Sequence, residues 1–207
     1  MPADAPVAER AHSDAPTTGM LVIGDEILSG RTIDANLVYA APRLAALGAP
    51  IQEARVIADD IPTIVAALNA LRTTCDQVIT SGGIGPTHDD KTAEAVAAAF
   101  GRPLVRSADA EARLRAHIGG ELNAARLKMA EVPEGAELID NPVSAAPGFR
   151  VENVYVFAGV PSIFRAMFDA VAPNFVAGPP LVSRSISAFV REGDLAAPLT
   201  DIAATYA

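Results

Sequence analysis

The residues with the clearest chemical potential form the run Gly82-Gly83-Ile84-Gly85-Pro86-Thr87-His88-Asp89-Asp90. The glycines allow the backbone to turn tightly and allow a ligand to approach it closely. A helix that begins after such a loop offers unpaired N–H groups and a partial positive charge, which suit a phosphate. The run lacks the Gly-Lys-Ser/Thr ending of a P-loop and is not a G-x-G-x-x-G fingerprint. The sequence therefore predicts a phosphate-binding loop of another type.

The two aspartates of this run are unfavourable neighbours for a phosphate. Unit charges about 4 Å apart repel by about 4 kcal/mol at an effective dielectric constant of about 20. A divalent cation such as Mg²⁺ reverses that sign, because carboxylate and phosphate oxygens both bind it. We therefore predict a divalent cation held by Asp90 and Asp89. The alternative is that Asp89 caps the helix while Asp90 complements its dipole, and each role can fall to a different carboxylate.

Further polar residues follow the other predicted strands. Gly24-Asp25-Glu26 follows the first strand, and Asp59-Asp60 follows the second. The carboxyl ends of parallel strands meet at one edge of a sheet, so these residues can share a crevice with the glycine loop. Alternatively, the first group is a solvated turn and Asp60 caps a helix. Lys91 and Lys128, the only lysines, can face a ligand phosphate or lie on solvated helix faces.

Strands alternate with helices along most of the chain, which is typical of a parallel sheet covered on both faces. Apolar runs and alternating segments predict strands at 20–24, 51–57, 77–80, 136–139, 151–157 and 181–190. Helical periodicity, together with Gly and Pro signals, predicts helices at 34–47, 60–71, 89–100, 107–129, 162–171 and 195–206. The fold class predicted is a doubly wound, three-layer α/β/α domain with a mostly parallel sheet, followed by a short incomplete C-terminal α/β appendage.

Length, composition and charge limit the possible domain organisation and the possible binding partners. The chain has 207 residues, a formal net charge of -9 and one cysteine, and half of its residues are hydrophobic. The negative charge argues against nonspecific nucleic-acid binding, which needs clustered cations. We find neither a signal peptide nor a membrane-spanning run, and expect a cytoplasmic protein. We expect a disordered leader at 1–18, a domain at 19–177, and a linker with the start of a small element at 178–207.

Several segments in order resemble the MoaB/Mog molybdopterin-binding family, in the branch formed by the N-terminal domain of the competence/damage-inducible protein CinA. Ile84 favours that branch, because the molybdenum-cofactor members usually have Thr there. The segments that carry the resemblance are 22–30 with Asn36, 80–90 with Thr92, 128–130 with Pro133, Asn141-Pro142, 146–149 and 159–162.

The resemblance implies a molybdopterin or adenine-nucleotide ligand and a homo-oligomer, either a dimer or a trimer. Some members adenylylate molybdopterin with ATP and Mg²⁺, whereas the CinA branch is associated with metal-dependent hydrolysis of ADP-ribose-type pyrophosphates. Candidate catalytic residues are Asp90, Asp89 and Asp59. Candidate ligand-binding residues are Gly24, Asp25, Glu26, Asn36, Thr80, Ser81, Gly82, Gly83, Gly85, Thr87, Thr92, Lys128, Gly148, Gly159, Pro161 and Ser162.

Three functions are consistent with these residues. The first is a domain that binds a phosphate-bearing pterin or nucleotide, with or without adenylyl transfer. The second is a Mg²⁺-dependent nucleotide pyrophosphatase acting on substrates like ADP-ribose, in which glycine-loop amides hold the developing charge. The third is a non-catalytic binding or regulatory module.

Overall fold

The interior strand β1 (Thr18–Ile23) shows how the sequence specifies the layers of the fold. The computed structural model describes residues 15–179, 184–185, 187 and 189–205. Leu21 and Ile23 pack into one hydrophobic cluster, while Met20 and Val22 pack into a second. Successive side chains of a strand point to opposite faces, so an apolar strand such as β1 must be covered on both faces.

The main sheet has six strands in the order β2-β1-β3-β8-β7-β6. Strands β2, β1, β3 and β8 run parallel to one another, whereas β7 and β6 are antiparallel additions at one edge. The other strands of this sheet are β2 (Ile51–Ile57), β3 (Gln77–Ser81), β6 (Glu137–Ile139), β7 (Gly148–Val151) and β8 (Val154–Phe157).

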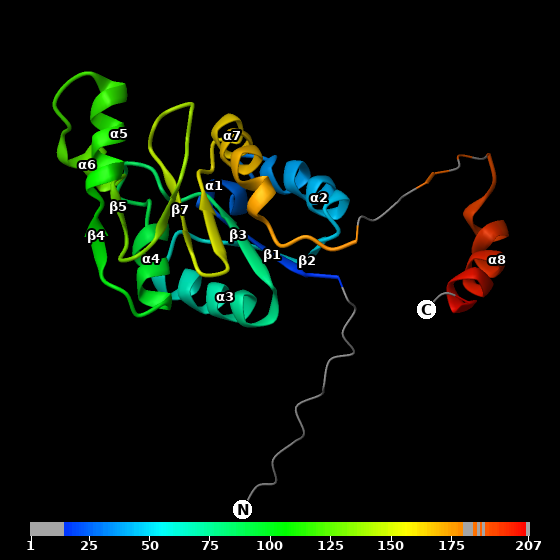
Figure 1. Cartoon of the computed structure of the whole chain (residues 1–207). Coiled ribbons are helices and arrows are strands. Elements are labelled where there is room, and N and C mark those ends of the chain that lie inside the picture. The colour runs from blue at the N-terminus through cyan, green and yellow to red at the C-terminus, as the bar shows by residue number, and fades with distance from the viewer. Residues whose placement is uncertain (1–14, 180–183, 186, 188, 206–207) are drawn as a thin grey trace, which may run out of the picture.

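Helices cover both faces of this sheet, as Figure 1 shows. One face carries α3 (Ile61–Thr74) and α4 (Thr92–Ala99), and the other carries α2 (Asn36–Ala46) and α7 (Pro161–Val171). The short helices are α1 (Asp25–Leu28) and the 3-10 turn η1 (Ala172–Asn174). The prediction of a three-layer, mostly parallel α/β/α domain is confirmed.

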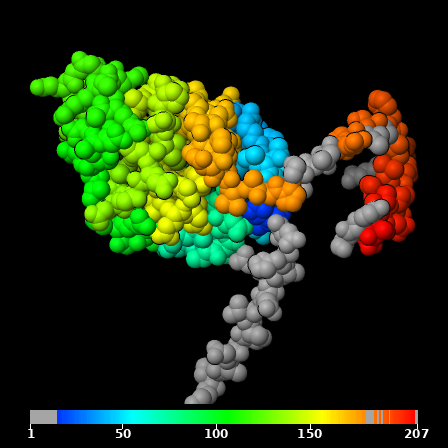
Figure 2. Space-filling model, in the orientation of Figure 1, coloured from blue at the N-terminus to red at the C-terminus, as the bar shows by residue number. Residues whose placement is uncertain are grey.

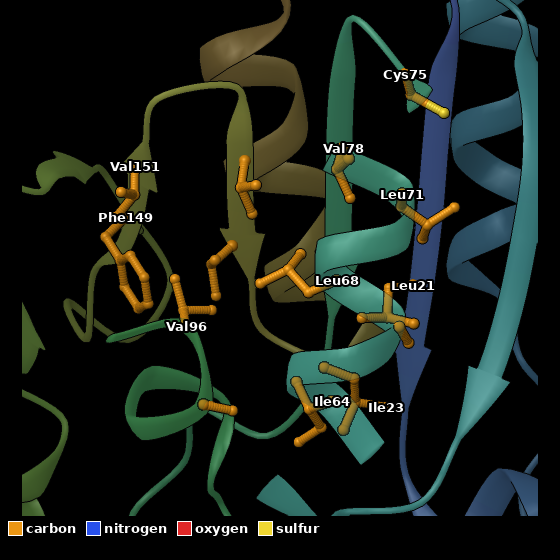
Figure 3. Packing of buried hydrophobic residues seen from close by; sticks show 14 of the residues in the cluster. Leu21, Ile23, Ile64, Leu68, Leu71, Cys75, Val78, Val96, Phe149 and Val151 are labelled. Atoms are coloured by element: carbon orange, nitrogen blue, oxygen red, sulfur yellow. The ribbon is translucent and has the colours of Figure 1, made fainter. Parts of the chain in front are cut away.

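Each face of the sheet has its own apolar core. In Figure 3, Leu21 and Val78 of the sheet face Ile64, Leu68 and Leu71 of α3. On the opposite face the aromatic rings of Phe164 and Phe168 in α7 lie against Phe157 of β8. Both cores hold the sheet rigid beneath the loops at the carboxyl ends of its parallel strands.

A smaller unit lies at one end of the domain, shown in green in Figure 2. It contains a two-stranded antiparallel sheet and two helices, and its core is formed by Ala110, Leu114 and Ala130. Its elements are β4 (Leu104–Arg106), α5 (Ala108–Ile118), α6 (Ala124–Lys128) and β5 (Glu131–Pro133).

Several boundaries differ from the sequence prediction. The helix predicted over 107–129 is divided, because Gly119 adopts φ 70° and ends α5 before α6 begins. The strand predicted over 151–157 is a hairpin of β7 and β8, whose turn holds Glu152 at φ 53°. The helix predicted from Asp89 begins at Thr92, so neither aspartate caps it; the N-cap position is Lys91.

The C-terminal segment is only partly as predicted. Helix α8 (Glu192–Thr205) is present, and none of its residues belongs to the three hydrophobic clusters of the described chain. The predicted strand at 181–190 lies partly outside the described residues, and residues 184, 185, 187, 189 and 190 are not in a strand. Residues 1–14 of the predicted leader also lie outside the described part.

Within the described ranges, no helix combines the length and apolar character needed to cross a membrane.

Candidate ligand-binding site

The turns that follow the four parallel strands are hydrogen-bonded to one another. The Gly24 amide after β1 donates to the carbonyl of Ile57 at the end of β2, at 3.0 Å. The amide of Asp25 donates to Asp59 Oδ2 at 2.9 Å. The amide of Gly82 after β3 donates to the carbonyl of Phe157 at the end of β8, at 3.1 Å. The sequence-predicted groups therefore meet at one edge of the sheet.

The glycine loop is held in shape by its own polar side chains. Asp90 Oδ2 accepts hydrogen bonds from both the amide and the hydroxyl of Thr87, at 2.8 and 2.5 Å. Lys128 of α6 donates to the carbonyl of Thr87 from the other side. The buried hydroxyl of Thr92 donates to the Gly82 carbonyl at 2.9 Å. Thr87, Thr92 and Lys128, all predicted ligand-binding residues, thus have demonstrable roles in fixing the loop.

Two glycines of the loop have no room for a side chain. Gly82 has φ 107°, and a Cβ there would lie 2.2 Å from the carbonyl oxygen of Ile23. Gly83 has φ 68°, and a Cβ there would lie 2.2 Å from Thr92 Oγ1. L-residues rarely adopt such positive φ values, so the loop needs glycine for both conformation and space.

Three successive amides of the loop, those of Gly83, Ile84 and Gly85, are available to a ligand. Within the described structure no group accepts a hydrogen bond from them, whereas the amides of Gly82, Thr87 and Thr92 are all paired. Clustered backbone N–H groups with no protein acceptor form an anion-binding concavity. The loop therefore presents donors to an anion without a basic side chain.

These residues line a cleft of about 360 Å³. The glycine loop with Asp90 forms one part of its lining, and the adjacent turn at Gly159 and Val160 forms another. The remaining lining residues are Glu26, Met129, Asn141, Ser144, Ala146, Ala158 and Ile163. Such a volume lies within the range of small-ligand sites.

The cleft is acidic, because the charged residues that line it are Glu26 and Asp90. Lys128 lines a smaller cavity of about 70 Å³ on the other side of Gly83 to Gly85. Burial raises the pKa of Asp59, and the carboxylates of Glu26, Asp25 and Asp89 raise it further, against the hydrogen bond from the Asp25 amide. An anionic ligand thus meets donors from the backbone but negative charge from the side chains.

Neutralising the neighbouring carboxylates Asp59 and Asp60 should change the stability of the fold in opposite directions. The folded state holds the Asp59 proton more tightly than the unfolded chain, so ionisation above pH 3.8 costs stability. We expect Asp59→Asn to raise the melting temperature at neutral pH by about 1 to 3 °C, with solvent screening limiting the gain. The gain should vanish in scans below the ordinary aspartate pKa.

Asp60→Asn is the matched control. Asp60 caps α3, and the hydrogen bonds from the Thr63 hydroxyl and amide lower its pKa, so its ionised form stabilises the fold above pH 3.8. We expect Asp60→Asn to lower the melting temperature slightly at neutral pH, and the loss to fade as the pH falls through the lowered pKa. Equal shifts in the same direction for both variants would contradict this assignment.

The donors present fit a cation that arrives with a phosphate. Within the described chain, no group of three or more His, Cys, Asp or Glu side chains is arranged to hold a metal ion. Mg²⁺ in phosphate sites commonly takes one or two carboxylates, and water and phosphate oxygens complete its octahedron. Asp90 in the cleft wall, with Asp89 exposed next to it, can supply such a partial set. The described residues fit a metal centre built from side chains alone less well.

Asn36 joins two of the turns. Its Nδ2 donates to Ser81 Oγ at 2.7 Å and to the carbonyl of Gly159 at 2.8 Å. This buried amide therefore sets the separation between the end of β3 and the turn before α7, which form two walls of the cleft. Its Oδ1 is buried without a hydrogen-bond partner.

The remaining predicted residues divide into two groups. Ser81 and Pro161 line a small cavity with Asn36, and Ser162 is exposed in the first turn of α7. Thr80 is fully buried, and Gly148 lies in β7, where a Cβ would meet Met167 and the carbonyl of Val156. The last two thus serve packing and do not line the cleft.

Two residues of the cleft, Asn141 and Ser144, were missed by sequence reasoning. Asn141 belongs to a segment that carries the family resemblance, yet no role is predicted for it. Ser144 has no motif at all. Only the loop geometry brings both into the lining of the cleft.

The chain matches the family described as "Probable molybdopterin binding domain" over residues 19–177. It is 38% identical over 159 residues to a protein of Archaeoglobus fulgidus, a match that covers 77% of this chain and 69% of that protein. It is 39% identical over 163 residues to a CinA-like protein of Citrifermentans bemidjiense, covering 75% of this chain and 39% of the relative. The chain thus spans about two fifths of that CinA-like protein's length.

Solved structures show the same relationship. The protein CinA of Thermoplasma acidophilum superposes with a TM-score of 0.74 at 34% identity, covering 78% of this chain and 99% of that one. The tungsten cofactor synthesizing protein MoaB of Pyrococcus furiosus superposes with a TM-score of 0.52 at 17% identity, covering 79% and 94%. At that identity the second match supports the fold alone.

Proposed function

Because the chain belongs to the family of probable molybdopterin-binding domains, in its CinA-like branch, we propose that it binds a phosphate-bearing pterin or nucleotide beside the Gly82–Asp90 loop. The observation that carries this proposal is the set of unpaired amides at Gly83, Ile84 and Gly85, three residues that line a ligand-sized cleft. Backbone donors of this kind recognise phosphate oxygens.

The rest of the cleft suits the remainder of such a ligand. Ile84, Met129, Val160 and Ile163 provide apolar walls on both sides. A flat heteroaromatic ring can lie between such walls while its phosphate reaches the loop amides. A divalent cation held by Asp90 and Asp89 would neutralise charge between the phosphate and these carboxylates.

Binding should depend on metal and nucleotide together. The described residues do not form a metal centre by themselves, so we expect Mg²⁺ alone to leave the melting temperature unchanged. ADP with Mg²⁺ should stabilise the protein by about 2.7 kcal/mol at about a hundred times its Kd. Thermal shift and titration calorimetry measure both effects.

The control for this experiment is ADP with EDTA, which should bind more weakly because the acidic residues then face the bare phosphates. Calorimetry with molybdopterin tests whether the protein binds a pterin. If neither ADP nor molybdopterin, with or without Mg²⁺, produces heat or a thermal shift at saturating concentration, the proposed function is wrong.

A metal-dependent pyrophosphatase is the second candidate, and the environment of Asp59 favours it. A carboxyl group with a raised pKa is suited to accept a proton from a water. In hydrolysis of ADP-ribose, water adds to one phosphorus and the bridging P–O bond breaks, giving AMP and ribose 5-phosphate. The loop amides would hold the negative charge that develops on the phosphoryl oxygens. A divalent cation would supply further charge neutralisation when bound.

Incubation of the purified chain with ADP-ribose and Mg²⁺, Mn²⁺ or Co²⁺ tests this second candidate. Release of AMP that Asp90→Asn abolishes would support it. Absence of AMP with every metal would exclude it and leave the binding function. Adenylyl transfer to molybdopterin and a non-catalytic regulatory role are then separated by incubation with ATP, Mg²⁺ and molybdopterin.

The expected dimer or trimer and the expected cytoplasmic location stay predictions. Light scattering coupled to size-exclusion chromatography measures the first.

A further inference from the structure

The loop between β6 and β7 is organised by one buried side chain, Asn141. Its Oδ1 accepts from the amides of Val143 and Ser144, at 3.0 and 3.2 Å. Its Nδ2 donates to Ser144 Oγ at 2.7 Å and to the carbonyl of Ala146 at 2.8 Å. An asparagine amide has two N–H donors and two acceptor lone pairs, so these four bonds use its full capacity. Asn141 therefore has nothing left to offer a ligand.

The hydroxyl of Ser144, in contrast, still has a hydrogen-bond donor to offer. It accepts the hydrogen bond from Asn141, so its own O–H hydrogen must point elsewhere. No acceptor among the described residues takes that hydrogen, and Ser144 lines the cleft. A serine donor is thus available in the lining of the cleft.

The backbone conformation next to Ser144 supports a role for this loop in ligand binding. Ala145 has φ 59°, a left-handed conformation that costs a residue with a Cβ about 1 to 2 kcal/mol. Strained backbone of this kind persists where the surroundings hold it, and it is concentrated at ligand sites. Here the bonds from Asn141 to Ser144 and Ala146 hold the loop on both sides of Ala145.

The chemistry of the other walls indicates which part of a bound ligand would lie beside Ser144. Met129, Ala146 and Ile163 are apolar, and the anion-binding amides lie at the glycine loop. A ligand whose phosphate occupies those amides places its remaining part, and not its phosphate, between the apolar walls. In a pterin or nucleotide that part includes a heteroaromatic ring, and the nitrogen atoms of such a ring can accept a hydrogen bond.

We propose that the Ser144 hydroxyl donates a hydrogen bond to an acceptor on the ligand's heteroaromatic ring, and that Asn141 is the positioning residue that aims it. This assignment rests on the proposed function, because it needs a phosphate-bearing ligand in the cleft. It makes Ser144 a specificity residue that separates ring-bearing phosphates from simple sugar phosphates.

Calorimetry with AMP, GMP and ribose 5-phosphate, each with Mg²⁺, tests the assignment. We expect Ser144→Ala to weaken binding of AMP or GMP by about fivefold to tenfold, the usual worth of one hydrogen bond. Its affinity for ribose 5-phosphate, which has no ring base, should equal that of the wild type. Ser144→Thr keeps the hydroxyl and should restore most of the loss. Thr73→Ala, which removes an exposed hydroxyl on α3, is the matched control and should change nothing.

The outcomes separate this assignment from the function beneath it. If the wild type binds ADP or molybdopterin but none of the three probes, the assignment alone is overturned. If it binds none of these five ligands, the proposed function is overturned with it. If the wild type binds AMP or GMP and Ser144→Ala binds it equally well, the assignment alone is overturned. An equal loss for ribose 5-phosphate would also overturn it, since that result indicates a general disturbance of the loop.

Amide hydrogen exchange measures the positioning role of Asn141 independently of any ligand. In Asn141→Ala, exchange at Val143 and Ser144 should accelerate by at least tenfold, because both amides lose their acceptor. Amides within β1 should keep their protection. Unchanged exchange at Val143 and Ser144 would show that Asn141 does not hold the loop.

Discussion

Gly82→Ala is expected to destabilise the protein by about 3 to 5 kcal/mol, the largest effect of any single methyl group in the site. The added Cβ would lie 2.2 Å from the carbonyl oxygen of Ile23, and the φ of 107° is itself unfavourable for alanine. The Ile23 carbonyl belongs to the interior strand β1, which is paired with β2 on one side and β3 on the other, so it cannot move without disturbing them. Thermal denaturation followed by circular dichroism should show a melting temperature lower by about 10 °C.

Gly101→Ala is the matched control for that experiment. Gly101 also has a positive φ, 61°, but nothing lies within 4 Å of the position its Cβ would take. It therefore measures the cost of the backbone conformation alone, about 1 kcal/mol. If Gly82→Ala is no more destabilising than Gly101→Ala, the close packing of the glycine loop on β1 is wrong.

Asp90→Asn is expected to remove most of the gain in nucleotide affinity that Mg²⁺ gives the wild type. In the presence of Mg²⁺ the variant should bind ADP at least about tenfold more weakly than the wild type, a loss of about 1.4 kcal/mol. In EDTA it should bind ADP as well as the wild type or better, because one carboxylate that repels the phosphate has gone. The fold should survive, since the asparagine Oδ1 can still accept from the amide and hydroxyl of Thr87.

Asp201→Asn on α8 is a suitable control, because it makes the same change in net charge on a helix outside the described clusters. Titration calorimetry of both variants with and without Mg²⁺ gives the comparison. A loss at Asp90→Asn that is equal in EDTA and in Mg²⁺ would mean that Asp90 supports the loop but holds no cation.

The sequence was sufficient to predict the layers of the fold and the edge of the sheet where the site lies. In β1, successive residues such as Leu21 and Val22 had to be buried on opposite faces, which requires helices on both sides. The polar turns after β1, β2 and β3 then had to meet, because parallel strands end at one edge. Asp60 is the helix cap that its position before Pro62 indicated.

Other features depend on contacts between distant residues, which local patterns do not encode. The division between α5 and α6 occurs at Gly119, although helical periodicity continues on both sides. Gly148 was predicted to bind a ligand, but it lies in β7, where a Cβ would meet Met167 and the carbonyl of Val156. The role of Asn141 follows only from the four bonds it makes within its loop.

The unpaired amides of Gly83, Ile84 and Gly85 are the centre of this account, and nuclear magnetic resonance observes them directly. A titration of ¹⁵N-labelled protein with ADP and Mg²⁺ should move these three amide resonances more than any others and slow their exchange with water. The amides of Gly82 and Thr92, which are already paired, should move less. If saturating ADP leaves the three resonances in place while shifting a different set, the phosphate binds elsewhere and the account is wrong.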